Sequence, residues 1–388
     1  MKKVLAAVLS LCMMLLVFVP AYAADENTQT QLKFNDDGEF KIIQFADTQD
    51  DVFPSKAMLT LMEKVCEELK PDLVVFSGDN VSQAIAPLNR AAIRQLIAPI
   101  AKLGIPYAYT FGNHDAENDV SKQTQHKYYM ENGNCLTYNA DDSLHGFGNC
   151  NLPILSSDGE DIAFNLWMID SNMYHPDGGY DIVYPDQMEW YETTSIALEE
   201  QAGHKVPSLV FQHIVPPEIF DYLEPAPEGT TESTKYHTGR DGSFLMRFKA
   251  DAPVNGGFFL QEFPCPTNFN TNEVEVMAQR GDVLGIAFGH DHVNNYIVSM
   301  ENGIDLIQTP GMSYQSYGND NVRGFRMFTL NENDPWSYET QTYKYTDFMS
   351  ASEINNFSAN LYQYFMSVMT IFDVAFKSIL SYLPGGRK

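Results

Sequence analysis

Six side chains able to bind a metal ion occur at five places along the chain, each directly after an apolar run. They are Asp47, Asp79, Asn113, His213, His290 and His292. Runs rich in Val, Ile, Leu, Phe, Tyr and Trp indicate β-strands. Ligands that follow strands gather at one edge of an open α/β fold, where carboxylates and imidazoles together can hold two metal ions. The spacing therefore predicts a dinuclear centre of the kind that activates water and binds the oxygens of an anionic substrate.

The segments around these residues alternate between strand-like and helix-like patterns. We expect strands at residues 41–46, 72–77, 107–111, 163–169, 207–211 and 283–288, and amphipathic helices at 56–69 and 90–103. Four later strands, at 296–300, 304–307, 325–330 and 340–345, are expected to be antiparallel. Two polar or irregular stretches, 116–160 and 214–272, interrupt the pattern, and we expect them on the rim and at the mouth of the site.

The N-terminus carries the pattern of an export signal. Lys2 and Lys3 precede an apolar core at residues 4–19, and Ala21-Tyr22-Ala23 has the form of a cleavage site. The apolar core is short for a membrane-spanning helix, which needs about 20 residues. We therefore expect residues 1–23 to be removed as a signal peptide and the protein to be secreted or periplasmic. The polar residues 24–39 are expected to be loose.

The chain is strongly acidic, with a formal net charge of −27 at pH 7. Nucleic acids and anionic membranes are held mainly by Lys and Arg, so neither is expected as a general partner. An anionic substrate is still allowed, because two divalent cations would invert the local field.

Cys135 and Cys150 flank a polar loop rich in Gly and Asn. Export favours a disulfide between them, with two free thiols as the alternative. In the chain-entropy account such a bridge contributes about 3 kcal/mol to stability.

Residues 351–388 form a C-terminal segment with an amphipathic helical pattern. Its apolar residues include Leu361, Phe365, Val368, Phe372 and Phe376. The pattern fits a helix docked on the body, a dimer surface or a membrane-surface helix. Because the segment lacks the Lys- and Arg-rich face of typical membrane-surface helices, docking is the favoured expectation.

The order of the motifs resembles a known family. The chain carries Asp47, Gly78-Asp79-Asn80, Gly112-Asn113-His114-Asp115, His213 and Gly289-His290-Asp291-His292 in that order. Over about residues 40–330 this is similar to calcineurin-like metallophosphoesterases. Further segments look closest to the Dcr2-type, purple acid phosphatase-like branch: Gln187-Met188-Glu189-Trp190, the turn from His213 to Glu218, Asn294 after the two histidines, Tyr317-Gly318 and Arg323-Gly324.

The resemblance implies a four-layer α/β/β/α sandwich, two mixed sheets flanked by helices, over residues 40–350. It also implies two divalent or mixed-valence metal ions, Mn, Fe or Zn, bridged by Asp79. Asp47 and His292 would bind one metal, and Asn113, His213 and His290 the other. His114 would be the catalytic residue that donates to a phosphoryl or leaving-group oxygen, and Asp115 would help to orient it.

One position departs from the family pattern. The family's first motif usually has a histidine two residues after the aspartate, where this chain has Gln49. An amide oxygen is a weaker ligand than imidazole for Mn, Fe or Zn. Gln49 would bind through oxygen, be replaced by water, or leave the first metal loosely held. Arg323 is a candidate phosphate-binding residue, with neutralisation of the acidic surface as the alternative.

Two functions follow. The first is an exported phosphoesterase that hydrolyses a small phosphate monoester or diester by in-line attack of a metal-bound hydroxide, assisted by His114. The second is a catalytically weakened binding or scaffold protein that keeps the fold. The presence of His114 favours the enzyme, because a scaffold needs no leaving-group donor.

Overall fold

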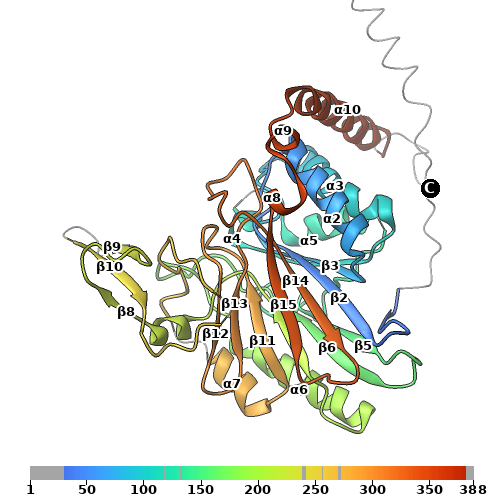
Figure 1. Ribbon diagram of the computed structural model, residues 1–388. Helices are drawn as coiled ribbons and strands as arrows, with labels where there is room; N and C mark the ends of the chain where they lie inside the picture. Colours follow the sequence, from blue (N-terminus) through green and yellow to red (C-terminus); the bar gives the residue numbers. More distant parts are fainter. Residues whose placement is uncertain are drawn as a thin grey trace, which may run out of the picture.

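Two mixed β-sheets lie face to face in the computed structural model, which describes residues 30–117, 119–131, 133–237, 242–255, 257–269 and 272–381 (Figure 1). The five-stranded sheet has the order β15 (Tyr338–Lys344), β14 (Gly324–Asn331), β2 (Glu39–Phe45), β3 (Leu73–Ser77), β4 (Tyr107–Thr110). The seven-stranded sheet has the order β1 (Leu32–Lys33), β5 (Cys150–Leu155), β6 (Ile162–Met168), β7 (Ser208–Phe211), β11 (Val283–Phe288), β13 (Asp305–Gln308), β12 (Tyr296–Ser299).

Helices cover the outer face of each sheet. On the five-stranded sheet lie α2 (Lys56–Leu69), α3 (Ala86–Leu103) and α5 (Lys122–Met130). On the seven-stranded sheet lie α6 (Pro185–Ala202) and α7 (Glu273–Arg280). A third core fills the space between the sheets, where Leu73 and Val75 of one sheet pack in the same cluster as Leu209 and Phe211 of the other. The four-layer α/β/β/α sandwich is thus confirmed.

The strands buried on both faces explain why their sequences are continuous apolar runs. Every residue of β3 and of β7 is buried, as expected for parallel strands covered by helices on one side and a second sheet on the other. β2, β3 and β4 are mutually parallel, and so are β7 and β11. Their carboxyl ends therefore point to the same edge of the sandwich.

Three segments differ from the sequence expectations. Residues 32–39, expected to be loose, supply β1 and the fully buried Phe34. The stretch 116–160 supplies α5 and the sheet strand β5 rather than only a rim insertion. Within 214–272 a small antiparallel sheet forms from β8 (Leu223–Ala226), β10 (Ser243–Phe248) and β9 (Thr234–His237). The predicted signal peptide and residues 24–29 lie outside the described residues.

The expected disulfide is not present. Cys135 and Cys150 are both free and buried. Cys135 packs in the core under the helices of the five-stranded sheet, whereas Cys150 packs in the core between the sheets. Burial raises the pKa of each thiol to about 12, so both stay protonated at neutral pH.

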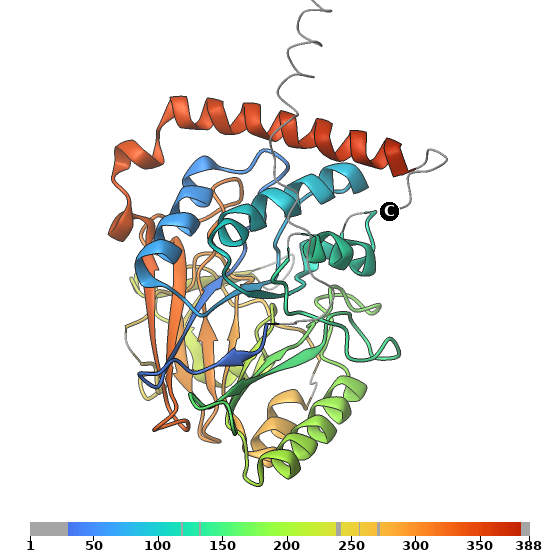
Figure 2. The ribbon, with the colours of Figure 1, turned by 90° about the vertical axis from the view of Figure 1, so that its right-hand side faces the viewer.

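The C-terminal segment contains α8 (Tyr345–Phe348), α9 (Ala351–Ile354) and the long helix α10 (Phe357–Ser381). α10 lies across α3 and α2 at one end of the molecule (Figure 2). It is therefore docked on the body, but its apolar stripe faces away from it: Phe365 and Phe372 are exposed. Among the described helices, none is long and apolar enough to cross a membrane.

Candidate metal centre

The carboxyl ends of five parallel strands bring the predicted ligands together. Asp47 follows β2, Asp79 follows β3, and Asn113 and His114 follow β4 in the short helix α4 (Asn113–Ala116). From the other sheet, His213 follows β7, and His290 and His292 follow β11. The site is therefore built by both sheets, at the edge where they meet.

Two groups of ligand atoms share one carboxylate. Asp79, His213 and His290 place ligand atoms within 4.8 Å of one another, and so do Asp47, Asp79 and His292. All five side chains are buried. An aspartate common to two such groups is the arrangement that a bridging carboxylate needs. The division of ligands between two metals, which the family resemblance implies, stays a prediction.

The backbone at the ligands is held in an unusual conformation. Asp47, Asp79 and His290 have φ values of 51°, 49° and 76°. Non-glycine residues rarely adopt this left-handed region, and such strain concentrates at functional sites. The neighbouring Gly112 has no space for a side chain, because an added Cβ would lie 2.2 Å from Oδ1 of Asp79. The glycine of the third motif thus lets the end of β4 approach the carboxylate of Asp79.

Hydrogen bonds orient two of the histidine rings. Nδ1 of His213 lies 3.0 Å from the carbonyl oxygen of Ser77, and Nδ1 of His292 lies 3.0 Å from that of Tyr317. In each ring a proton on Nδ1 satisfies the carbonyl and leaves Nε2 directed at the aspartates. Backbone carbonyls commonly fix metal-binding histidines in this tautomer.

Burial and mutual charge set the protonation of the cluster. Burial acts against charge on Asp79, but its charge interaction and hydrogen bond with His213 outweigh burial and hold the pKa of Asp79 below its usual value. Burial also opposes charge on His213, yet Asp79 raises its pKa to about 9. Burial raises the pKa of Asp47 and lowers those of His290 and His292 to about 3 and 4. A cation that enters the site would displace the proton of His213.

The remaining oxygen donors support a metal site. Oδ1 of Asn113 is buried and has no hydrogen-bond partner in the described part of the chain, although buried polar atoms are normally paired. An amide oxygen, two carboxylates and three imidazoles form a donor set that suits Mn, Fe or Zn. The residues present therefore fit the metals implied by the sequence.

Gln49 reaches into the same cluster. Its amide nitrogen lies 3.2 Å from Oδ2 of Asp79 and 3.4 Å from Nε2 of His292. The side chain thus occupies the position from which a histidine would contact the first metal. It donates to the carboxylate of Asp79 instead of offering an imidazole.

His114 stands beside the ligands with its ring half-exposed. Its Nε2 lies 3.9 Å from Oδ2 of Asp79, and its Nδ1 lies 2.5 Å from Oε2 of Glu117. Asp115 is fully buried and accepts hydrogen bonds from the backbone amides of Gly112 and Asn80, so it fixes the loops beside His114. Its help in orienting the His114 ring stays a prediction.

Five side chains at the mouth were missed by sequence reasoning or given little weight. The Tyr174 hydroxyl donates to Glu117 at 2.5 Å, and the Tyr180 ring packs edge-on against His290. Tyr317 stacks on His292 with ring centroids 4.2 Å apart and donates to Glu262 at 2.9 Å. Tyr317 belongs to a segment that resembles the family branch. Glu117 also had a sequence signal, since it follows His114 by three residues and so lies on the same face of a helical turn.

The two arginines of the Gly-rich stretch are engaged elsewhere. Arg323 pairs with Asp320 at 3.3 Å and lies over the Tyr314 ring. Its role in substrate binding stays a prediction. Arg326 is buried and donates to Asn295 and to the Gln308 carbonyl, which ties β14 to the loop after β11.

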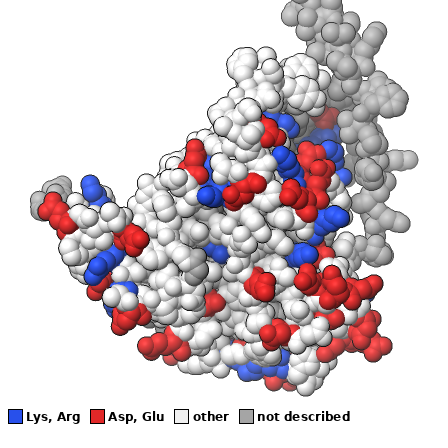
Figure 3. Space-filling view, in the orientation of Figure 1, with Lys and Arg blue, Asp and Glu red and all other residues white. Residues whose placement is uncertain are grey.

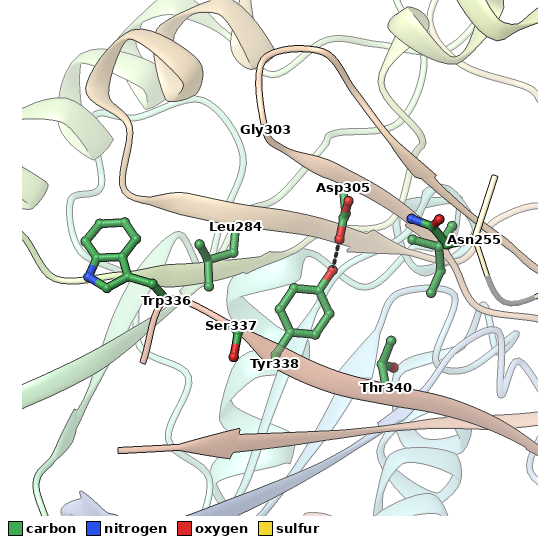
Figure 4. Close-up of a pocket in the computed structure, with 9 residues that line it drawn as sticks. Asn255, Leu284, Gly303, Asp305, Trp336, Ser337, Tyr338 and Thr340 are labelled. Carbon is green, nitrogen blue, oxygen red and sulfur yellow. Dashed lines mark hydrogen bonds between the residues drawn. The ribbon is translucent and has the colours of Figure 1, made fainter. Parts of the chain in front are cut away.

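A separate cavity of about 330 Å³ lies near the other end of β11 (Figure 4). Its lining includes Leu284, Asp305 and Tyr338, and the Tyr338 hydroxyl donates to Asp305. None of its lining residues is a histidine, cysteine, lysine or arginine. The metal cluster, and not this cavity, therefore carries the candidate chemistry.

The chain belongs to the calcineurin-like phosphoesterase family, whose model matches residues 40–294. It is 32% identical to probable inactive purple acid phosphatase 14 of Arabidopsis thaliana, over 82% of this chain and 81% of that protein. It is 25% identical to the phosphatase DCR2 of Saccharomyces cerevisiae, over 78% of this chain and 51% of the yeast protein.

Among solved structures, a dimetal phosphatase from Danio rerio aligns with 79% of this chain and 99% of its own, at 12% identity and a TM-score of 0.46. The sequence relatives thus agree with the branch that the motifs resemble. A second Arabidopsis thaliana relative, at 29% identity over 74% of this chain and 75% of its own, is also named a probable inactive purple acid phosphatase.

Proposed function

We propose that this protein is a metal-dependent hydrolase of phosphate monoesters or diesters. The observation that carries the proposal is the pair of ligand groups that share Asp79, with His114 directly beside them. When bound, two metal ions supply a nucleophile at neutral pH and neutralise charge on the phosphoryl oxygens. Family membership supports the same reaction class.

His114 is suited to act on the leaving group. Its Nδ1 is engaged by Glu117, so its Nε2 faces the cluster. Proton donation to a departing oxygen at this position contributes about 10²- to 10⁴-fold to such reactions. No serine, threonine or cysteine nucleophile is needed, because attack on phosphorus is direct.

Hydrolysis of p-nitrophenyl phosphate and bis-p-nitrophenyl phosphate by protein loaded with Mn, Zn or Fe tests the proposal. We expect turnover that a chelator abolishes and that the exposed-residue control His204→Ala leaves unchanged. With an alkyl phosphate, whose leaving oxygen needs a proton, we expect His114→Ala to reduce turnover at least 100-fold. The preferred ester identifies monoester or diester specificity. Absence of turnover with all three metals, with metal binding confirmed, would contradict it.

A weakened binding protein is the second candidate. It is favoured by the position of Gln49 in the cluster and by the word inactive in the names of two relatives. Gln49→His separates the two cases: a silent wild type that gains turnover in this variant supports a detuned site, while wild-type turnover excludes it.

We also propose that the protein is exported. The basic start, the apolar core and Ala21-Tyr22-Ala23 support this. Mass spectrometry of the protein made in its host would find Ala24 at the N-terminus. An intact chain confined to the cytoplasm would refute export without affecting the phosphoesterase proposal.

A further inference from the structure

α10 is docked by a mixed face, in which Val374 packs in a small apolar cluster with Val52 and Ala91 and polar side chains lie beside it. Ser367 and Gln363 are buried against α3, where the Ser367 hydroxyl donates to Oε1 of Gln95 at 2.6 Å and Nε2 of Gln363 donates to the same oxygen at 3.2 Å. Asp373 pairs with Arg94 beside them. A helix docked by the hydrophobic effect alone would bury its apolar stripe instead.

The apolar stripe is left in solvent. Five of its residues have exposed side chains: Phe357 (79%), Leu361 (59%), Phe365 (52%), Phe372 (65%) and Phe376 (55%). At 3.6 residues per turn these positions fall within an arc of about 100°. Large contiguous apolar surfaces are rare on monomeric proteins and mark contacts with other molecules. We call this surface the α10 stripe.

The α10 stripe is convex and long. The helix has 25 residues, which corresponds to about 37 Å, and it lies along the end of the body with its outer side uncovered (Figure 2). A flat surface can contact the whole stripe at once, whereas a small ligand would need a concave site.

The distribution of charge indicates which kind of flat surface would bind the α10 stripe. Between Phe357 and Ser378 the helix carries only Asp373 and Lys377 as charged residues, and these pair with each other at 3.0 Å. This end of the molecule is correspondingly white in Figure 3, with charged atoms only at its lower margin. An uncharged stripe on a chain of net charge −27 fits an uncharged partner. A second copy or an anionic lipid surface would bring further negative charge towards it.

We propose that the α10 stripe binds the surface of a lipid bilayer with zwitterionic headgroups. Aromatic and aliphatic side chains on one helix face insert at the boundary between headgroups and acyl chains, and Phe and Leu are typical of the apolar face of such helices. Binding by this surface depends on apolar contact, so it is insensitive to salt. It does not increase when anionic lipid is added. The metal centre takes no part in it, so it stands apart from the proposed activity.

Flotation with phosphatidylcholine vesicles tests the proposal on the chain from Ala24 to Lys388, which keeps every described residue and lacks the apolar leader. We expect co-flotation in 0.1 and 0.5 M salt, and at least tenfold weaker binding for Phe365→Gln/Phe372→Gln. Trp336→Gln, at a site 48% exposed in the hairpin turn between β14 and β15, is the matched control and should bind as wild type.

Light scattering on the same samples tests whether the α10 stripe binds a second copy of the chain instead of a lipid surface. A doubled mass that the Phe365→Gln/Phe372→Gln variant abolishes, without flotation, would assign the stripe to a second copy and overturn the proposal. Binding that requires phosphatidylglycerol, equal flotation of the double variant, or no binding in either experiment would overturn it as well. Unchanged melting temperatures would show that the exposed substitutions leave the fold intact.

Discussion

Glu117, three residues after His114, is hydrogen-bonded to the His114 ring, with Oε2 of Glu117 2.5 Å from Nδ1 of His114. The other oxygen of Glu117 accepts from the Tyr174 hydroxyl, so the carboxylate is itself fixed. A carboxylate bonded to Nδ1 fixes the orientation of an imidazole ring. Glu117 is therefore a positioning residue, which acts through His114.

Glu117→Gln should lower kcat for esters with poor leaving groups. An alkyl phosphate needs a proton on the departing oxygen, whereas p-nitrophenolate leaves without one, so we expect a loss of about 10- to 100-fold for the former and a small change for the latter. KM should stay nearly constant. Steady-state kinetics over a series of leaving groups measure this. Tyr174→Phe, which keeps the carboxylate, should show a weaker form of the same pattern, and equal losses for all esters would show that Glu117 has only a structural role.

Gln49→His should strengthen metal binding at the Asp47–His292 end of the cluster. Imidazole replaces an amide that donates to Asp79, and we expect at least tenfold tighter binding of one Zn or Mn equivalent, as imidazole ligands favour these metals. Titration calorimetry with metal analysis gives the affinity and the stoichiometry. Gln49→Ala controls for simple removal of the amide, and identical affinities in all three proteins would mean that position 49 does not contact the metal.

The ligand cluster was predictable because it depends on strand ends. Asp79 and His213 are far apart in sequence, yet each follows a fully buried strand, and parallel strands place such residues at one edge. The residues around the opening of the metal centre were not predictable in the same way. Tyr174 and Glu262 reach the site from loops whose course depends on tertiary contacts, so no periodicity identifies them.

The orientation of α10 shows a different limit. The spacing of Phe365 and Phe372 indicates a helix with an apolar side, and that helix forms. The pattern leaves open which side faces the body, however. Here the hydrogen bonds of Gln95 and the packing of Val374 against Val52 and Ala91 hold the less apolar side inward, which the composition of the helix alone does not reveal.

Gln95→Ala should loosen α10 more than Arg94→Ala. Gln95 is buried, and its loss leaves the Ser367 hydroxyl and the Gln363 amide without their acceptor, which costs about 1 to 3 kcal/mol. The Arg94–Asp373 pair is roughly a third exposed on both sides, and such pairs contribute about 0 to 1 kcal/mol. Hydrogen exchange along α10 provides the measurement. Greater loosening by Arg94→Ala would mean that the ion pair is the principal anchor.

Glu273 should make the protein less stable as the pH rises. It is the first residue of α7 and is buried, and burial, reinforced by the charge of Glu218, raises its pKa to about 8. The unfolded chain releases this proton near pH 4.5, while the folded chain retains it, so between these values the unfolded state binds fewer protons. Because of this group, the free energy of unfolding therefore falls by up to about 1.4 kcal/mol for each pH unit between these two pKa values. The stability that the Glu273 proton provides is fully present only below pH 4.5. Glu273→Gln should remove that slope and exceed wild type in stability at pH 8. Urea unfolding at pH 5 to 8 tests this, with the exposed Glu275→Gln of the same helical turn as control, and equal slopes in wild type and Glu273→Gln would show that Glu273 is ionised in the folded protein.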